Sequence, residues 1–395
     1  MQNGSRRYWS TLGIAFFLSF SIWAPLFCVP PMENILKQEF SISNTQASLL
    51  FTIPILMLVV TAIPSGLLAD KIGAKKSICF GAVVVAIGTM GRGIANNYLT
   101  LLVFSLIYGL GFGWVFTNLP KLVSSATRTG RAGITAGIYF SGALFGDALA
   151  LAITLPLIYH LTRTYQEVFF LWSIPAFLAA VLCWVMIKEQ PAIQSSSSSV
   201  TLLGKVLKNK GLWLVGILLF FHNFYFYTWA NWGPQLMMQK GANPDQASLT
   251  TSLLLWVAVP TVFLMPKLAF RVGLKKPFLW VPGIALAFFA WAAIYANLTI
   301  SWLIMILIGV VNITRFITIL ALPTEMVPAE NIGAASGLIF CLGYLGATVG
   351  PIISGHILDL TGSLKLSLYS LVALSLIAAG IALFVPETSP NDKSY

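Results

Sequence analysis

The sequence contains little charge. Only 9% of its 395 residues are Asp, Glu, Lys or Arg, whereas soluble domains carry about 25%. Among the charged residues the acidic ones are fewer, with 12 Asp and Glu against 23 Lys and Arg. Hydrophobic residues make up 57% of the chain. A soluble core cannot absorb this much apolar sequence, so we expect lipid to surround much of the chain.

Sequence signals of catalysis and metal binding are also missing. The four Cys and three His are scattered, without the paired spacing of zinc or redox sites. There is no glycine-rich phosphate loop and no nucleophile motif. We therefore expect no enzyme, no metal and no cofactor. Without an ATP-binding motif, any transport has to draw on an ion gradient or on the gradient of the substrate itself.

Apolar runs long enough for a helix to cross the hydrocarbon core, about 20 residues, occur twelve times. They cover residues 9–31, 45–69, 77–95, 98–120, 132–158, 168–187, 211–236, 246–266, 277–295, 300–324, 333–357 and 364–386. The first run follows MQNGSRRYW without a small-residue cleavage site, which predicts a retained helix. The sequence predicts an all-α integral membrane protein with twelve transmembrane helices.

The basic residues indicate how these helices are oriented. With both termini in the cytoplasm, seventeen Lys and Arg fall in cytoplasmic segments and five at outer or outer-edge positions, and Arg315 completes the 23. This bias is the expected one for the cytoplasmic side of a membrane. It accounts for the net charge of +11 without nucleic acid as a partner. We expect a multi-pass protein of a bacterial inner membrane.

The chain divides into two similar halves. A serine-rich stretch at 188–210 is typical of a flexible linker and separates residues 1–187 from residues 211–395. QASL occurs at 46–49 and 246–249, and KIGAKK at 71–76 corresponds to RVGLKK at 271–276. The same offset of 200 relates Gly133, Gly137, Phe140 and Gly146 to Gly333, Gly337, Phe340 and Gly346. Two parallel six-helix bundles, related by pseudo-symmetry around a central site, are a transporter architecture.

The stretch GLLADKIGAKK, residues 66–76, resembles the loop motif of the major facilitator superfamily between helices 2 and 3. The positions that fit are Gly66, Leu68, Asp70, Lys71, Gly73, Lys75 and Lys76, while Ala74 departs from the pattern. The resemblance implies the fold of that superfamily and alternating access around a site lined mainly by helices 1, 4, 7 and 10. It also implies that Asp70, Lys71 and Lys75 form a cytoplasmic latch in the outward-open state.

Arg315 lies near the middle of the tenth span, in GVVNITRFITILALP. A charge at this depth costs at least about 2.5–3.5 kcal/mol on insertion scales, so such residues usually face a cavity or a partner. Asn312 shares its helix face, and a guanidinium suits a carboxylate. These residues predict an anion site, and an internal salt bridge is an alternative that does not exclude it.

Asp147 is the one acid expected near the membrane midplane, and three roles are open for it. It pairs with Arg315, carries a coupling proton, or has a static partner such as a tyrosine or lysine. Lys121, at the cytoplasmic end of the fourth span, either attracts anions or extends to the interface. Arg92, near the outer end of the third span, is expected to extend to the interface.

The seventh span contains the aromatic run FFHNFYFYTWANWGP. His222 and Asn223 lie near mid-span, and we expect the run to contribute substrate-binding residues, including Trp229. Trp23 corresponds to Asn223 at the offset of 200 and is a further candidate, as is Tyr139. His222 has either a substrate or proton role or only a hydrogen bond inside the bundle.

The function predicted from these residues is secondary transport of a small, carboxylate-like anion, coupled to protons or another ion, by a monomer. The sequence loosely resembles the branch of the superfamily that contains cyanate and nitroimidazole carriers and relatives of nitrate porters. The alternative is a cation or drug:proton antiporter, based on Asp147 and an aromatic pocket. Exporters of this superfamily have a glycine-proline pattern on the fifth span, whereas here Gly350 and Pro351 lie on the eleventh. This difference counts against a drug exporter.

Overall fold

The computed structural model describes residues 2–124, 132–187, 204, 206–264, 275–328 and 331–386, and places their side chains except at 2–7 and 132–134. The described residues form helices and short connections, with no β-strand among them. The first half contains α1 (Gln2–Phe27), α2 (Val29–Phe40), α3 (Asn44–Ile72), α4 (Ala74–Gly93), α5 (Tyr98–Ser124), α6 (Ala132–Ile153), the π-helix η1 (Thr154–Tyr159), α7 (His160–Thr162) and α8 (Tyr165–Met186). The second contains α10 (Lys210–Gln239), α11 (Pro244–Trp256), α13 (Pro277–Tyr295), α14 (Leu298–Ala321), α15 (Pro323–Met326), α16 (Ile332–Thr361) and α17 (Leu364–Ala382).

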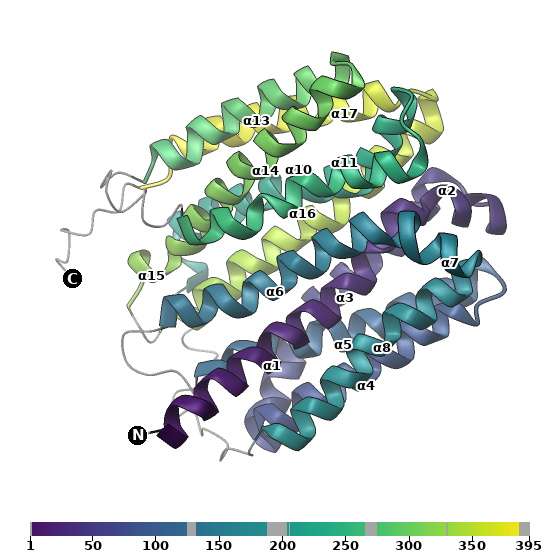
Figure 1. Ribbon diagram of the computed structural model, residues 1–395. Helices are drawn as coiled ribbons and strands as arrows, with labels where there is room; N and C mark the ends of the chain where they lie inside the picture. Colours follow the sequence, from purple (N-terminus) through teal and green to yellow (C-terminus); the bar gives the residue numbers. More distant parts are fainter. Residues whose placement is uncertain are drawn as a thin grey trace.

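Twelve spans in this described part are long and apolar enough to cross a membrane, and each overlaps a predicted span. The predicted all-α fold is therefore confirmed. Of the predicted linker, only residue 204 and residues 206–210 are described. Figure 1 shows the two halves as groups of long helices lying side by side, with the beginning of α1 and the end of α17 at the same end of the molecule.

The internal repeat recurs in the local geometry. Ser43 caps α3 by accepting from the backbone N–H of Gln46, whose side chain accepts from the N–H of Ser43. Asn243 and Gln246 form the same capping box at the start of α11, 200 residues later. This arrangement satisfies backbone donors that would otherwise lack a partner at a helix start.

Close helix packing repeats as well. A Cβ atom added at Gly146 on α6 would lie 2.8 Å from the carbonyl oxygen of Phe20 on α1. The corresponding Cβ at Gly346 on α16 would lie 2.0 Å from the carbonyl oxygen of Phe220 on α10. Only glycine allows these backbones to approach so closely, which is a common way to pack helices in membranes.

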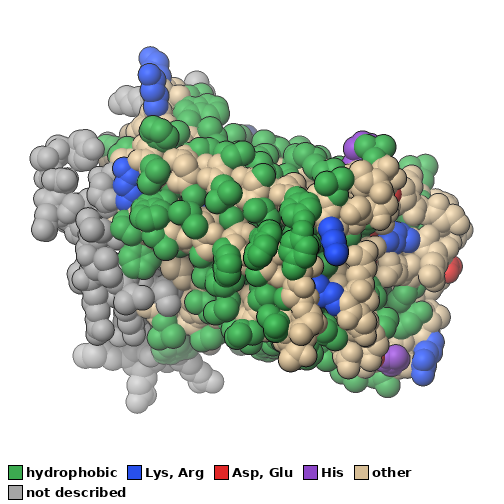
Figure 2. Space-filling view, turned by 90° about the horizontal axis from the view of Figure 1, so that it is seen from above, with side chains coloured by type: hydrophobic (Ala, Val, Ile, Leu, Met, Phe, Trp, Pro, Cys, Tyr) green, Lys and Arg blue, Asp and Glu red, His purple; other side chains and the backbone are tan. Residues whose placement is uncertain are grey.

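The outside of the bundle suits lipid. Hydrophobic side chains cover much of the face in Figure 2, and most of the visible charged side chains lie toward its two ends. Phe288 and Trp291 on α13, for example, are 58% and 50% exposed. Apolar side chains at the surface and polar groups inside are what a bilayer requires.

The expectation for Arg92 was wrong. Its side chain is fully buried instead of extending to the interface. Nη1 donates to the carbonyl oxygen of Pro25 at 2.9 Å, and the guanidinium lies 4.2 Å from the ring centroid of Tyr108. Pro25 lies in the last turn of α1, where carbonyl groups lack helical partners, so a cation is stabilising at this helix end.

The two halves are joined at their outer ends by a set of polar contacts that we call the outer seam. Asp359 at the end of α16 accepts four hydrogen bonds of 2.6–2.9 Å from the N-terminus of α3. The other pairs of the seam are Asn231 with Glu33 at 3.2 Å and His160 with Asp245 at 2.8 Å. The outer ends of the two halves are therefore in contact.

Candidate functional site

A pocket lies between the two halves. Helices α1 and α6 line it from the first half, and α10, α11, α14 and α16 from the second. Its aromatic side chains are Trp23, Phe140, Phe226, Tyr227, Phe316 and Tyr344. Its other polar side chains are Asp147, His222, Asn223 and Asn312. The remaining lining residues are apolar, so the pocket combines a mainly apolar lining with few polar groups, as small-molecule sites do.

Helix periodicity explains how the side chains come together. Phe140, Leu144 and Asp147 recur along one face of α6, and Gly309, Asn312 and Phe316 along one face of α14. Positions three, four and seven residues apart lie on the same side of a helix. Each of these helices therefore turns one stripe toward the pocket.

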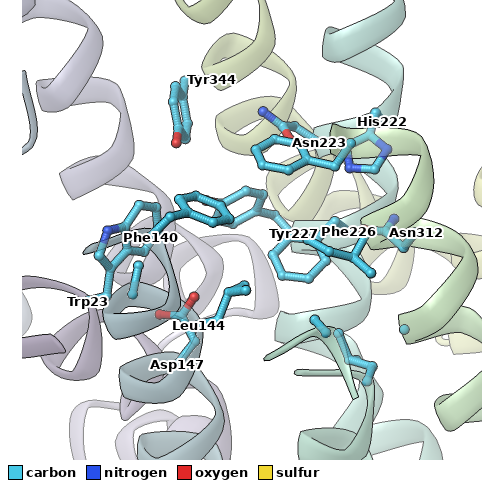
Figure 3. Close-up of a pocket in the computed structure, with 16 residues that line it drawn as sticks. Trp23, Phe140, Leu144, Asp147, His222, Asn223, Phe226, Tyr227, Asn312 and Tyr344 are labelled. Atoms are coloured by element: carbon cyan, nitrogen blue, oxygen red, sulfur yellow. The ribbon is translucent and has the colours of Figure 1, made fainter. Parts of the chain in front are cut away.

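Five of the predicted site residues line this pocket. They are Trp23, Asp147, His222, Asn223 and Asn312. Figure 3 shows Trp23 and Asp147 on one side and His222, Asn223 and Asn312 on the other. The polar groups predicted from two halves of the sequence thus meet at one place.

Arg315 is placed beside the pocket and does not line it. Its side chain is 1% exposed, and its Nε and Nη2 atoms have no hydrogen-bond partner among the described residues. It lies one helical turn from Asn312 and within electrostatic range of His222. Because leaving buried donors unpaired is costly, these nitrogens make Arg315 a candidate for contact with a bound polar group.

Several buried polar atoms of the pocket likewise lack partners in the described part of the chain. They are Trp23 Nε1, Asp147 Oδ1, His222 Nδ1 and Asn312 Nδ2. Native proteins rarely leave buried polar atoms unpaired, and each instance calls for an explanation. Four such atoms around one pocket make it the candidate site for a polar ligand.

Stacked aromatic rings connect the halves on one side of the pocket. Phe140 on α6 stacks on Phe316 on α14, with centroids 5.6 Å apart and planes at 20°. His222 stacks on the same phenylalanine at 5.4 Å and 25°. Trp23 is held edge-on by Phe112 at 4.8 Å. These contacts fix the rings that face the pocket.

Two predicted binding residues lie elsewhere. Trp229 is fully buried among the helices of the second half, 6.3 Å from Tyr225. Tyr139 precedes Phe140 on α6 and is half-buried outside the lining. Tyr139 falls on the face of α6 next to the one that turns toward the pocket, whereas Trp229 lies further along α10, beyond the last residues of that helix that line it.

The cytoplasmic residues form a separate group. Lys121 Nζ lies 2.6 Å from Asp70 Oδ1 and donates to the carbonyl oxygen of Gly66 at 2.9 Å. Lys75 lies over the ring of Trp184 at 5.2 Å, and Lys71 is exposed. In this conformation Lys121 therefore contacts the loop motif of its own half, away from the pocket.

Sequence reasoning missed half of the aromatic residues that line the pocket. Phe140, Phe316 and Tyr344 were not candidates, although they line the pocket. A signal for two of them was available: Phe140 lies seven residues before Asp147, and Phe316 four residues after Asn312. Tyr344 has no such signal, because no charged or amide side chain lies one turn from it on α16. The described residues contain no group of three His, Cys, Asp or Glu placed to bind a metal.

Comparison with known proteins identifies the family. The model of the Major Facilitator Superfamily matches residues 12–351, with a second match at 233–394. The chain belongs to the Major Facilitator Superfamily. As a member of this superfamily it is a transporter and not an enzyme, and it is a multi-pass protein of a bacterial cell membrane.

Relatives within the Major Facilitator Superfamily cover nearly the whole chain. It is 28% identical to the uncharacterized transporter YycB of Bacillus subtilis, over 95% of this chain and 92% of that one. It is 22% identical to the cyanate transport protein CynX of Escherichia coli, over 85% and 86%. A 2-nitroimidazole transporter of Escherichia coli and a nitrite extrusion protein of Bacillus subtilis are also similar, which confirms the predicted branch.

A solved structure has the same fold. The bacterial homologue of the human lysosomal transporter Spinster, in an inward-facing and unoccupied conformation, superposes with a TM-score of 0.82. Its sequence is 15% identical, over 96% of this chain and 97% of that one.

Proposed function

We propose that the protein transports a small anion of the carboxylate type, with a proton, by alternating access through the pocket between its halves. The observation that carries this proposal is Arg315, buried beside the pocket with two guanidinium nitrogens unpaired among the described residues. Asn312 and His222 add further donors on the same side of the pocket. Two relatives are named for anions, cyanate and nitrite.

Asp147 supports the proton part of the proposal. It is 4% exposed and lines the same pocket, and neither it nor Arg315 has an ion-pair partner among the described residues. A carboxylate and an anionic substrate repel each other in one small pocket. Two like charges about 8–10 Å apart at an effective dielectric constant near 20 repel by roughly 2 kcal/mol. Protonation of Asp147 removes this repulsion, so that anion and proton favour each other's binding.

The remaining residues have roles in the conformational cycle. Asp70, Lys71 and Lys75 form the cytoplasmic latch of the outward-open state, and Lys121 holds Asp70 while the outer side is closed. We assign coupling to Asp147 and gating to Lys121. The halves are joined in sequence by the predicted linker 188–210 and act as a monomer, each supplying one side of the pocket.

A cation:proton antiporter is a second candidate, because Asp147 lines the pocket directly whereas Arg315 lies behind the lining. Aromatic rings also bind organic cations. In that case Asp147 would hold the cation, and Arg315 would oppose it.

Thermal stabilisation of the purified protein separates the two candidates. The probes are small carboxylates, inorganic anions and lipophilic cations, applied to wild type, Arg315→Ala and Asp147→Asn. Stabilisation by a carboxylate in wild type and its loss in Arg315→Ala is the expected result. Stabilisation by cations alone, retained in Arg315→Ala and lost in Asp147→Asn, would establish the antiporter instead.

A further inference from the structure

The pocket contains more aromatic surface than the binding of a simple anion requires. Six rings line it, two from the first half and four from the second. An apolar wall desolvates a small inorganic anion without replacing its lost hydrogen bonds. The same wall is well matched to a flat apolar body, since rings attract rings beyond the effect of the area that they bury.

We propose that the substrate is a small planar aromatic monocarboxylate, an inference that rests on the proposed function. The carboxylate is held on the side of Asn312, His222 and Arg315. The ring lies against the aromatic wall. Three properties of the pocket lead to this class: its polar groups are few, they lie on opposite sides, and the free space is small.

The few polar groups exclude a polyhydroxylated acid. Apart from two tyrosine hydroxyls and one indole N–H, the lining offers only Asp147, His222, Asn223 and Asn312. Each hydroxyl of a sugar acid would need a partner inside the pocket, and an unpaired one is costly. A substrate with its polarity concentrated in one group suits this lining better.

The distribution of charge excludes a second carboxylate. Donors lie on the side of His222 and Asn312, while the unpaired acceptor Asp147 Oδ1 lies on the side of Trp23. A dicarboxylate that spans the pocket would bring its second charge to Asp147. One carboxylate and an uncharged ring avoid this contact, and the ring keeps the substrate charge away from the acid.

The free space in the pocket limits the size of the substrate. The centres of water molecules can occupy about 50 Å³ in this conformation, whereas one water needs roughly 10–15 Å³. This space suits a compact molecule such as a single ring with a short acidic group. It does not suit a long amphiphile or a molecule with several fused rings.

Binding of four probes to the wild-type protein tests the inference. Benzoate, cyclohexanecarboxylate and acetate are titrated calorimetrically at one pH, together with benzyl alcohol as an uncharged ring. We expect benzoate to bind roughly tenfold more tightly than cyclohexanecarboxylate, because only a flat ring gains the aromatic contacts. Acetate has the carboxylate without a ring, and benzyl alcohol has the ring without a charge. Both are expected to bind more weakly than benzoate or cyclohexanecarboxylate.

Two variants connect the preference to named rings. Phe140→Leu and Phe316→Leu are each expected to reduce the ratio of benzoate to cyclohexanecarboxylate affinity about threefold, since a leucine keeps the apolar bulk without the ring. Phe288→Leu is the matched control, because Phe288 lies on the exposed surface of α13. The ratio compares two ligands in one protein, so a loss of folded protein does not change it.

The outcomes separate this inference from the proposed function. Equal binding of benzoate and cyclohexanecarboxylate, lost in Arg315→Ala, would overturn the aromatic preference and leave anion transport intact. Binding of none of the carboxylates, with binding of a lipophilic cation such as tetraphenylphosphonium, would overturn both. An unchanged ratio in both phenylalanine variants would also overturn the inference, because the preference would then arise elsewhere.

Discussion

Neutralising Asp359 should open the outer side of the protein. Its carboxylate accepts from the backbone N–H and side chain of Asn44 and of Thr45, at 2.6–2.9 Å. It therefore joins the last turn of α16 to the N-terminus of α3 in the other half. Outward opening has to break all four hydrogen bonds, so Asp359 stabilises only the outward-closed state.

The size of the effect follows from these contacts. Asp359→Asn keeps one acceptor oxygen but removes the charge. Hydrogen bonds to a charged group contribute about 1.5–3 kcal/mol and neutral ones about 0.5–1.5. A negative charge at a helix N-terminus adds roughly 0.3–1 kcal/mol. Because Asp359 is exposed, solvent screening reduces these contributions, and we expect a net loss of about 2 kcal/mol, which changes the ratio of closed to open molecules roughly thirtyfold.

Distance measurements between spin labels on the two halves test this prediction. Asn96→Cys and Lys365→Cys place labels at exposed outer positions, and Cys341→Ser removes the one native cysteine of intermediate exposure. Asp359→Asn is expected to enlarge the population with a long distance. Glu167→Gln is the matched control, as it neutralises an exposed outer acid away from the seam. A distance distribution that is the same for Asp359→Asn and the control would refute the reasoning.

Three further predictions concern the site, the packing and the latch. Asp147→Asn should bind the carboxylate as tightly at pH 8 as at pH 6, because the variant has no charge that repels the anion. In wild type the affinity for the carboxylate should fall by up to roughly thirtyfold over the same rise in pH. The same pH dependence of affinity in both proteins, measured by calorimetry, would contradict this. Gly346→Ala should lower stability in detergent by about 1–3 kcal/mol, since its Cβ would meet a backbone oxygen at 2.0 Å, while Gly337→Ala, with no atom within 4 Å, should not; equal melting temperatures would refute the packing argument. Lys121→Met should change stability by less than about 1 kcal/mol, because its ion pair with Asp70 is more than a third exposed; a larger loss in thermal unfolding would show that the pair supports the fold itself.

Much of the fold could be predicted because lipid imposes simple rules. A helix has to be apolar over a fixed length, so all twelve spans were visible in the sequence. The repeat was equally visible, since Gly146 and Gly346 serve the same close approach in each half. Arg92 was misjudged because its position near a helix end suggested the interface. Its actual contacts, Pro25 and Tyr108, come from other helices and leave no sign near it in the sequence.

The site could be predicted only in part. Polar residues in apolar spans are conspicuous, which is why Asp147, His222 and Asn312 were found. Aromatic residues are not, because a phenylalanine suits lipid, core and pocket alike. The rotation of each helix decides which of these it faces, and that rotation depends on packing against other helices. Arg315 shows the same limit: it was predicted to face the cavity, but its side chain lies beside the residues that line the pocket.

Uptake into proteoliposomes tests the central claim most directly. The vesicles contain wild type, Arg315→Ala or, as a control at an exposed cytoplasmic lysine, Lys208→Ala. Their interior is alkaline, and a radiolabelled carboxylate that stabilises the purified protein is supplied outside. The account predicts accumulation above equilibrium by wild type and Lys208→Ala, and none by Arg315→Ala. Accumulation by Arg315→Ala at the wild-type rate would contradict the claim that this arginine holds the transported anion.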